Sequence, residues 1–172
     1  ADCFVRFARW PADRVWTIPN GIDAALYERL DAPRGAASGG RHEVPYRVAY
    51  TSTPERGLAL LVTQIMPVIW QSEPDVELHV FSYRPLDAYR RLRGAEDPRV
   101  RFRGGLPQDA LARALAGFDL WLYPTDFPET SCIAAMEAQA AAVPVVSSKR
   151  YALQETVIDG ATNLVIGTVW IR

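Results

Sequence analysis

The sequence predicts an α/β fold with a doubly wound, mostly parallel sheet. Three observations lead to this prediction. After Tyr46, short apolar runs alternate with segments of helical periodicity, one of the runs is nearly all apolar, and glycine or proline marks several boundaries. Alternation of this kind is typical of βαβ units, in which helical crossovers join parallel strands. Strands joined by helical crossovers are expected to form a doubly wound sheet with helices on both faces, and the crossovers should then be right-handed.

Six strands are expected in this part of the chain, at YRVAYTS (46–52), VELHVFSY (76–83), RVRFRG (99–104), FDLWLYPT (118–125), VPVVSS (143–148) and TNLVIG (162–167). The fourth is the nearly all-apolar run, as in a strand buried on both faces. Helices are expected at 56–70, 86–94, 107–117, from near Thr130 onward, and at 152–157. Pro107 stands near the start of the third helix and Gly117 at its end, as helix boundaries prefer.

The first part of the chain has a different character. RVWTIPNGID (14–23) reads as a strand followed by an Asn-Gly turn, and the Gly/Ala/Ser-rich stretch 31–43 is expected to be a mobile link. We therefore expect residues 1–43 to be an interdomain segment with its linker and residues 44–172 to form one Rossmann-like domain. Both ends look cut, so this domain is expected to be truncated at its C-terminus.

Length and composition indicate a protein with a small-molecule site. The 172 residues suffice for one domain with its own core, and the formal net charge of -1 gives no field that would gather nucleic acid. No apolar run approaches the roughly 18 to 20 residues that span a bilayer. Cys3 and Cys132 alone do not make a disulfide framework, which favours a reducing, cytoplasmic setting.

In an open α/β sheet, ligands bind at the carboxyl ends of the strands. The loops expected there are 51–57, 82–85, 103–107, 124–131 and 147–152. Arg56 and Gly57 stand at the start of a helix, where free N–H groups and the helix dipole favour an anion. The alternative is a solvated arginine beside a turn glycine. Neither the dinucleotide fingerprint G-x-G-x-x-G nor a P-loop is present.

Two glutamates, Glu129 and Glu137, flank the start of the helix expected from Thr130. Eight residues of helix correspond to about 12 Å, so a ligand that touches both carboxylates must be long. A sugar at Glu129, a diphosphate at the helix start and a ribose whose hydroxyls donate to Glu137 would match. Alternatively, Glu129 only charges the helix start and Glu137 is an exposed helical glutamate. The many alanines of this helix favour close packing against a sheet or ligand.

The motifs IPNGID, PERGLALL, PTDFPETSCIAAMEAQAAAVPVV and ALQETVIDGATNLVI resemble, in this order, a known domain. It is the C-terminal, Rossmann-like, nucleotide-sugar-binding domain of retaining glycosyltransferases with the GT-B fold, and the group 1 (family 4) set is the most similar. The resemblance runs from about Arg14 to Ile166. Each motif alone is weak, and their ordered combination is specific.

The resemblance implies roles for particular residues. Glu129 would contact the donor sugar and Arg56 would neutralise the diphosphate, which makes these two the catalytic candidates. Glu137 would hold the ribose hydroxyls. The remaining implied donor-binding residues are Gly57 at the helix start, Thr130, Ser131 and Cys132 in the phosphate loop, and Arg103, Gly104 and Gly105 against the nucleobase. Asn20, Gly21 and Asp23 would border the cleft between two domains.

The chain departs from the family's pattern where glycine is usual. Tyr50 and Thr51 stand in place of a Gly-Arg pair, Thr-Ser-Cys replaces a glycine-rich phosphate loop, Ala142 replaces a glycine, and Tyr151-Ala152 replaces a Gly-Gly pair. These departures fit either a variation within a subgroup or a weakened donor site.

The implied reaction is transfer of a sugar, with retention, from a UDP-sugar or GDP-sugar to a glycan or lipid-linked acceptor. The acceptor would be held by an N-terminal domain outside this chain, so the chain alone is expected to bind nucleotide and to transfer little. No cofactor or metal is expected, and His79 reads as a structural histidine. The implied setting is cytoplasmic, with peripheral association at the inner membrane face. The alternatives are a non-catalytic Rossmann-like binding module and a GT-B relative such as a sugar-nucleotide epimerase or a phosphorylase.

Overall fold

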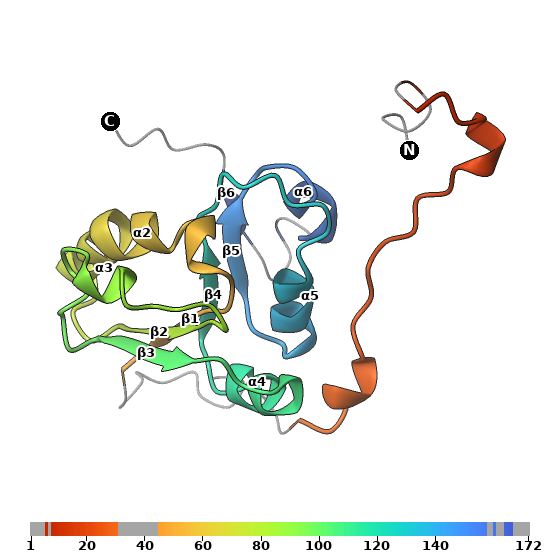
Figure 1. Ribbon diagram of the computed structural model, residues 1–172. Coiled ribbons are helices and arrows are strands. Elements are labelled where there is room, and N and C mark those ends of the chain that lie inside the picture. Colours follow the sequence, from red (N-terminus) through yellow and green to blue (C-terminus); the bar gives the residue numbers. More distant parts are fainter. Residues whose placement is uncertain (1–5, 7, 31–44, 158–159, 161–163, 167–172) are drawn as a thin grey trace.

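The computed structural model describes residues 6, 8–30, 45–157, 160 and 164–166 (Figure 1). A six-stranded sheet with the order β3-β2-β1-β4-β5-β6 forms its centre, and every neighbouring pair is parallel. The strands are β1 (Arg47–Tyr50), β2 (Glu77–Phe81), β3 (Val100–Gly104), β4 (Leu120–Tyr123), β5 (Val145–Ser148) and β6 (Leu164–Ile166). All six lie where the sequence predicted strands. The strand order reverses between β1 and β4, which defines the switch point of the sheet.

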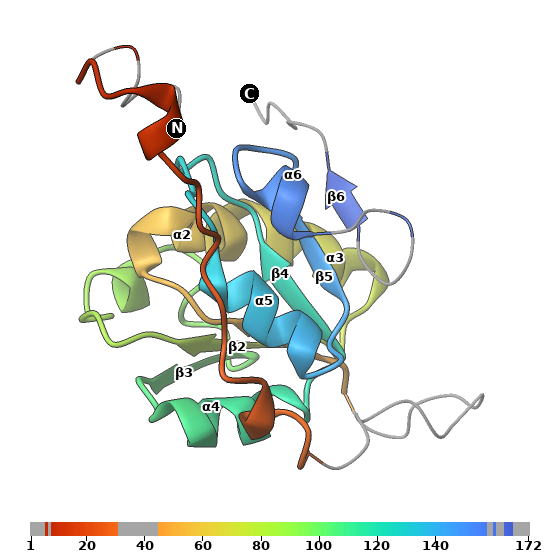
Figure 2. The ribbon, with the colours of Figure 1, turned by 90° about the vertical axis from the view of Figure 1, so that its right-hand side faces the viewer.

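Helices cover both faces of the sheet, as predicted. They are α2 (Leu58–Leu60), α3 (Met66–Ser72), α4 (Gln108–Leu115), α5 (Ile133–Ala140) and α6 (Leu153–Thr156). Short 3₁₀ turns occupy Ala12–Arg14, Ala24–Leu26, Pro54–Arg56 and Tyr89–Arg91. Figures 1 and 2 show α2 and α3 on one face and α4 and α5 on the other. The fold is therefore doubly wound.

A π-helical turn, Leu61–Ile65, joins α2 to α3. Pro67 follows it in the first turn of α3. Proline cannot donate a backbone hydrogen bond, and its ring would clash with the carbonyl four residues earlier in a regular α-helix. The wider π turn absorbs this conflict without ending the helix.

The core lies between the sheet and its helices. Trp121, Tyr50 and Tyr123 are the largest fully buried side chains. On α5, Ala135 and Ala138 are fully buried. These small side chains let α5 lie close to the sheet, as its alanine content predicted, and so fix the position of the loop that precedes it.

Three predictions of local structure were wrong. Residues 15–23 form no strand, and Trp16 and Ile18 are exposed. Pro19 supplies no backbone donor for a ladder. The helix expected at 86–94 is reduced to the turn Tyr89–Arg91. Its apolar residues recur every third position, at 86, 89 and 92, which suits a 3₁₀ turn.

The third correction concerns α5, which begins at Ile133 rather than near Thr130. Cys132, just before it, has a φ of 53°, so the chain enters the helix through a left-handed residue. Glu129 therefore belongs to a loop, and the helical distance between the two glutamates does not apply. The link predicted at 31–43 lies outside the described residues.

Candidate active site

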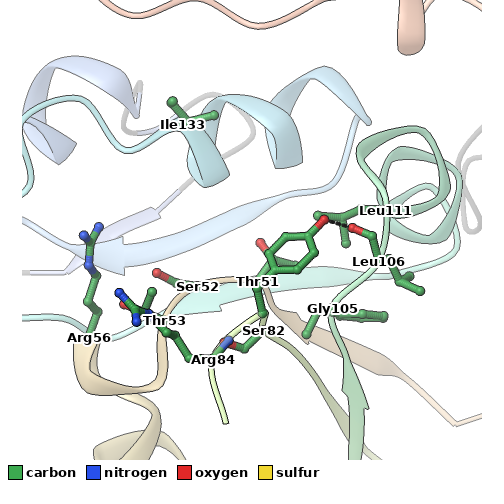
Figure 3. Close-up of a pocket in the computed structure, with 12 residues that line it drawn as sticks. Thr51, Ser52, Thr53, Arg56, Ser82, Arg84, Gly105, Leu106, Leu111 and Ile133 are labelled. Carbon is green, nitrogen blue, oxygen red and sulfur yellow. Dashed lines mark hydrogen bonds between the residues drawn. The ribbon is translucent and has the colours of Figure 1, made fainter. Parts of the chain in front are cut away.

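A cavity of about 500 Å³ opens at the carboxyl ends of β1, β2 and β3 (Figure 3). Its lining residues come from the loops after these strands and from α4 and α5: Thr51, Ser52, Thr53, Arg56, Phe81, Ser82, Tyr83, Arg84, Gly105, Leu106, Leu111 and Ile133. A smaller pocket of about 210 Å³ shares Ser52, Arg56 and Ile133 with this cavity. The two pockets therefore adjoin at these residues, and together they are called the cleft; it lies beside the switch point, where ligands bind in open α/β sheets.

The smaller pocket contains an ion pair. Nη1 of Arg56 lies 3.0 Å from Oε1 and 3.2 Å from Oε2 of Glu129. The Glu129 side chain is only 5% exposed, whereas that of Arg56 is 33% exposed. The guanidinium also stacks on Phe127, 4.0 Å from the ring centroid. Burial of Glu129 is tolerated because the cation is beside it, and the partly open cation still faces the cleft.

Tyr123 adds a second contact to Glu129. Its hydroxyl donates to Oε1 across 2.5 Å and lies 3.3 Å from Oγ of Ser52. Burial, followed by the hydrogen bond to Glu129, raises the pKa of Tyr123. The phenol therefore remains a donor at neutral pH and fixes one carboxylate oxygen, while Arg56 contacts both.

Gly57 holds the loop that carries Arg56. Its φ is +114°, and a Cβ at this position would lie 1.9 Å from the carbonyl oxygen of Pro124. Only glycine permits this close approach between the loops after β1 and β4. The glycine therefore helps to bring Arg56 within reach of Glu129.

The predicted phosphate loop lies at the start of α5. Thr130, Cys132, Ile133 and Ala134 line the smaller pocket, whereas Ser131 uses its carbonyl to accept from Oγ1 of Thr156. The first N–H groups of a helix have no partner within it, so this end of α5 offers donors to a ligand. Burial raises the pKa of the Cys132 thiol to about 12, which keeps it neutral.

Glu137 lies on α5 one turn after Ile133, and positions four apart share a helix face. It is buried, so the alternative of an exposed helical glutamate is wrong. Its Oε1 accepts a hydrogen bond from Nε2 of Gln108 at 3.3 Å. Burial raises the pKa of Glu137, and the bond from Gln108 opposes this. Glu137 is not among the residues that line the two pockets of the cleft.

The structure places the three residues expected against a nucleobase in different surroundings. Gly105 lines the large cavity, and a Cβ there would lie 2.4 Å from the ring of Tyr83. Gly104, with a φ of +77°, ends β3. The Arg103 side chain instead points to His79, with Nε 3.3 Å from Nδ1. His79 is buried and also bonds Glu77, as expected of a structural histidine.

The N-terminal candidates differ among themselves. Asn20 lines the smaller pocket, and Oδ1 of Asp23 accepts from the backbone of Ala25 at the turn Ala24–Leu26. Gly21 has open space around it. Only Asn20 is therefore brought to the cleft itself.

The residues that were not singled out from the sequence include Ser52, Tyr83 and Arg84, which line the large cavity, and Tyr123, which bonds Glu129. Tyr123 belongs to the nearly all-apolar run and so reads as core. The loops 51–57 and 82–85 were predicted to face the ligand, but nothing in their composition set Ser52, Tyr83 or Arg84 apart. Their contribution depends on which side chains point into the cavity.

The described residues contain no group of three or more His, Cys, Asp or Glu side chains that could hold a metal ion. Among them, no helix has the length and apolar character needed to cross a bilayer.

The fold is that of an α/β protein whose cleft lies at the switch point of a parallel sheet, the place where open α/β sheets bind ligands. Residues 46–169 match the family model described as glycosyl transferases group 1. The chain belongs to this family. It is 31% identical over 147 residues to a phosphatidyl-myo-inositol mannosyltransferase of Mycobacterium tuberculosis, a match covering 83% of this chain and 37% of the relative. A lipopolysaccharide 1,2-N-acetylglucosaminetransferase of Salmonella typhimurium is 26% identical, covering 90% of this chain and 44% of that protein.

Solved structures share the fold at low sequence identity. The Anabaena protein HepE in complex with UDP superposes with a TM-score of 0.69 and 22% identity, covering 93% of this chain and 45% of HepE. The C-terminal domain of LpcC, a group 1 glycosyl transferase from Francisella tularensis, gives a TM-score of 0.62 and 17% identity, covering 86% of this chain and 80% of that domain. The chain thus spans less than half the length of the curated relatives and matches most of an isolated C-terminal domain.

Proposed function

We propose that this chain is the donor-binding part of a retaining glycosyltransferase, which binds a nucleoside-diphosphate sugar, UDP- or GDP-linked, in the cleft. The observation that carries the proposal is that the two ends of the large cavity differ, one being charged and polar and the other apolar. Arg56, Thr53 and Arg84 lie at one end, and Gly105, Leu106 and Leu111 lie at the other (Figure 3). A nucleoside diphosphate has the same division, because its phosphates are charged and its base is flat and largely apolar on its faces.

Arg56 and Glu129 are the proposed catalytic residues. The leaving group of the reaction is a nucleoside diphosphate, so catalysis requires a group that stabilises its developing charge. Arg56 contacts Glu129 through Nη1, and the guanidinium has further N–H donors at Nε and Nη2 for phosphate oxygens. Glu129, fixed by Arg56 and Tyr123, would accept from hydroxyls of the donor sugar in the smaller pocket and hold it in position.

The remaining contacts follow from the order of the elements. N–H groups at the start of α5 would bind the phosphate next to the sugar. The base would lie near Gly105, with the ring of Tyr83 beside it. For Glu137 to accept from the ribose, the ribose hydroxyls would take the place of the Gln108 amide. Its position one turn from Ile133, a lining residue, supports this proposal.

The acceptor would be a glycan or a lipid-linked sugar, held by a part of a longer protein outside this chain. The names of the mycobacterial and Salmonella relatives, a phosphatidyl-inositol and a lipopolysaccharide transferase, support a membrane-associated acceptor. A cytoplasmic enzyme that associates peripherally with the inner membrane face fits such an acceptor. Neither a metal nor a cofactor is required by this scheme.

One observation favours the alternative of a binding module without catalytic activity. Cys132 has a φ of 53° and is buried at the start of α5, where a phosphate would have to approach the backbone. A side chain at this position leaves less room for the phosphate than glycine would.

Calorimetric titration of the chain with UDP, GDP and ADP tests the proposal. We expect one diphosphate to bind and its affinity to fall at least tenfold in Arg56→Ala and in Glu137→Gln. Arg93→Ala, which removes an exposed arginine that does not line the cleft, is the matched control and should bind as the unchanged chain does. If the unchanged chain binds no nucleoside diphosphate, the proposal is wrong for this chain.

A further inference from the structure

The ion pair of Arg56 with Glu129 does not by itself supply the positive charge that would balance a bound nucleoside diphosphate. A nucleoside diphosphate carries about three negative charges near neutral pH, because its terminal phosphate titrates near pH 6 as other phosphate monoesters do. Arg56 is already paired with the buried Glu129, so the two together contribute no net charge. At the end of β1, Tyr50 is fully buried and Thr51 accepts a hydrogen bond from Trp121, so neither supplies a cation.

We infer that Arg84, in the loop after β2, is a second diphosphate-binding residue of this cleft. This inference rests on the proposed function. Arg84 lines the large cavity together with Thr53 and Arg56. In Figure 3 its side chain extends toward the end of the cavity where these two residues lie. Two arginines from different loops, one after β1 and one after β2, thus approach the same region.

The loop that carries Arg84 is held at both ends. Ser82 and Leu86 are buried, and the three residues between them are exposed. The backbone N–H of Arg84 donates to Oγ of Ser82 at 3.1 Å, which closes a local turn. Tyr83 is fixed as well, because its hydroxyl donates to the carbonyl of Leu106. The backbone at Arg84 is therefore positioned before a ligand arrives, which lowers the entropic cost of binding.

Arg84 also differs in its surroundings from three other arginines of the domain. Arg99, Arg101 and Arg113 each form a salt bridge with a carboxylate. For Arg84, the described part of the chain shows no carboxylate within salt-bridge distance. An arginine on a cavity wall without an acidic partner is suited to an anionic ligand, since its planar group can contact two phosphate oxygens at once.

The inference is tested with Arg84→Ala and Arg84→Lys, titrated with UDP and with inorganic pyrophosphate. Because Arg84 is exposed, both variants should fold. We expect Arg84→Ala to bind both ligands about tenfold more weakly than the unchanged chain, since it loses charge-assisted hydrogen bonds to the phosphates. Arg84→Lys should recover part of this loss, and Arg93→Ala should bind as the unchanged chain does.

The dependence on salt provides a second readout. Raising the ionic strength should weaken UDP binding less in Arg84→Ala than in the unchanged chain, because one charge contact is already missing. If Arg84→Ala binds UDP and pyrophosphate unchanged while Arg56→Ala loses both, the inference is wrong and the proposed function stands. If the unchanged chain binds pyrophosphate through Arg84 but no nucleotide, the anion site stands and the proposed function is wrong. If the unchanged chain binds neither ligand, both are wrong.

Discussion

Nη1 of Arg56 lies 3.0 Å from Oε1 of Glu129, although the two residues are 73 positions apart in the sequence. Arg56 follows β1 and Glu129 follows β4, and these are the two strands between which the strand order reverses. The ion pair therefore joins the two halves of the sheet at the switch point. It has a structural effect and an electrostatic one, and variants can separate them.

Replacing Arg56 by alanine is expected to destabilise the domain as well as to weaken nucleotide binding. The substitution leaves the buried carboxylate of Glu129 without its cation, and breaking a buried pair costs several kcal/mol. Because Arg56 is 33% exposed, water can partly replace it, so we expect a loss of about 2 kcal/mol in the free energy of unfolding at pH 7. Urea denaturation measures this value.

The double variant Arg56→Ala/Glu129→Gln is the control for that destabilisation. It removes the uncompensated charge while the hydroxyl of Tyr123 can still donate to the side-chain oxygen. We expect it to be more stable than Arg56→Ala alone and to bind no nucleotide. A double variant as unstable as Arg56→Ala would show that the loss comes from packing on Phe127 rather than from charge.

Glu137 gives a prediction about pH. Burial raises the pKa of Glu137 in the folded chain above its ordinary value of 4.5. A raised carboxyl pKa means that the folded state holds its proton more tightly than the unfolded state. The contribution of Glu137 to stability is therefore fully present below pH 4.5 and declines as the pH rises through the folded-state pKa.

Glu137→Gln removes this titration while keeping the shape of the side chain. The variant should gain stability relative to the unchanged chain as the pH rises above about 4.5, and the difference should become constant once the folded-state pKa is passed. Urea denaturation from pH 4 to pH 8 measures it. An equal stability difference at every pH would contradict the prediction. If Glu137→Gln is more stable and also binds UDP more weakly, the Glu137 carboxylate contributes to binding although its burial lowers the stability of the fold.

Much of the fold could be predicted from the sequence because the signals were local. The six strands were evident from apolar runs, and α4 from its proline and glycine boundaries. The site was only partly predictable. The loops at the carboxyl ends of the strands were predicted to face a ligand, and of the residues predicted there Arg56 and Glu129 line the cleft, whereas Gly57 and Glu137 do not. The ion pair between Arg56 and Glu129 depends on the distance between two loops far apart in the sequence. The contact of Tyr123 with Glu129 depends on the conformation of the loop that follows β4.

The backbone angles show what happens at the positions where the chain departs from the family's glycine pattern. Cys132, Ala142 and Tyr151 all have positive φ values, at positions where the resemblance implies glycine. The backbone thus keeps left-handed conformations although the residues have side chains. Sequence alone showed the substitutions, and only the backbone angles show that the conformation was kept at a cost of about 1 to 2 kcal/mol per residue.

Ala142→Gly is therefore expected to stabilise the domain. Ala142 has a φ of 56° just after α5, and the N–H of Val143 bonds the carbonyl of Ala138, as in the usual glycine-ended helix. Glycine removes the strain but adds freedom to the unfolded chain, so the net gain should be about 0.5 to 1 kcal/mol. Ala140→Gly, at the last residue of α5, is the control and should cost up to about 1 kcal/mol. Thermal unfolding measures both, and a destabilised Ala142→Gly would contradict the assigned backbone strain.

Gly57→Ala should destabilise the domain and weaken nucleotide binding. The new Cβ would lie 1.9 Å from the carbonyl oxygen of Pro124, so the loops after β1 and β4 must separate and Arg56 must move away from Glu129. Gly160→Ala is the matched control: its φ of +86° is also left-handed, but nothing lies within 4 Å of its Cβ. The control should lose only the conformational term of about 1 to 2 kcal/mol. Gly57→Ala should lose at least about 3 kcal/mol, because overpacking adds to that term. Urea denaturation and UDP titration of the two variants measure the difference, and equal losses in both assays would mean that the approach to Pro124 contributes nothing to the site.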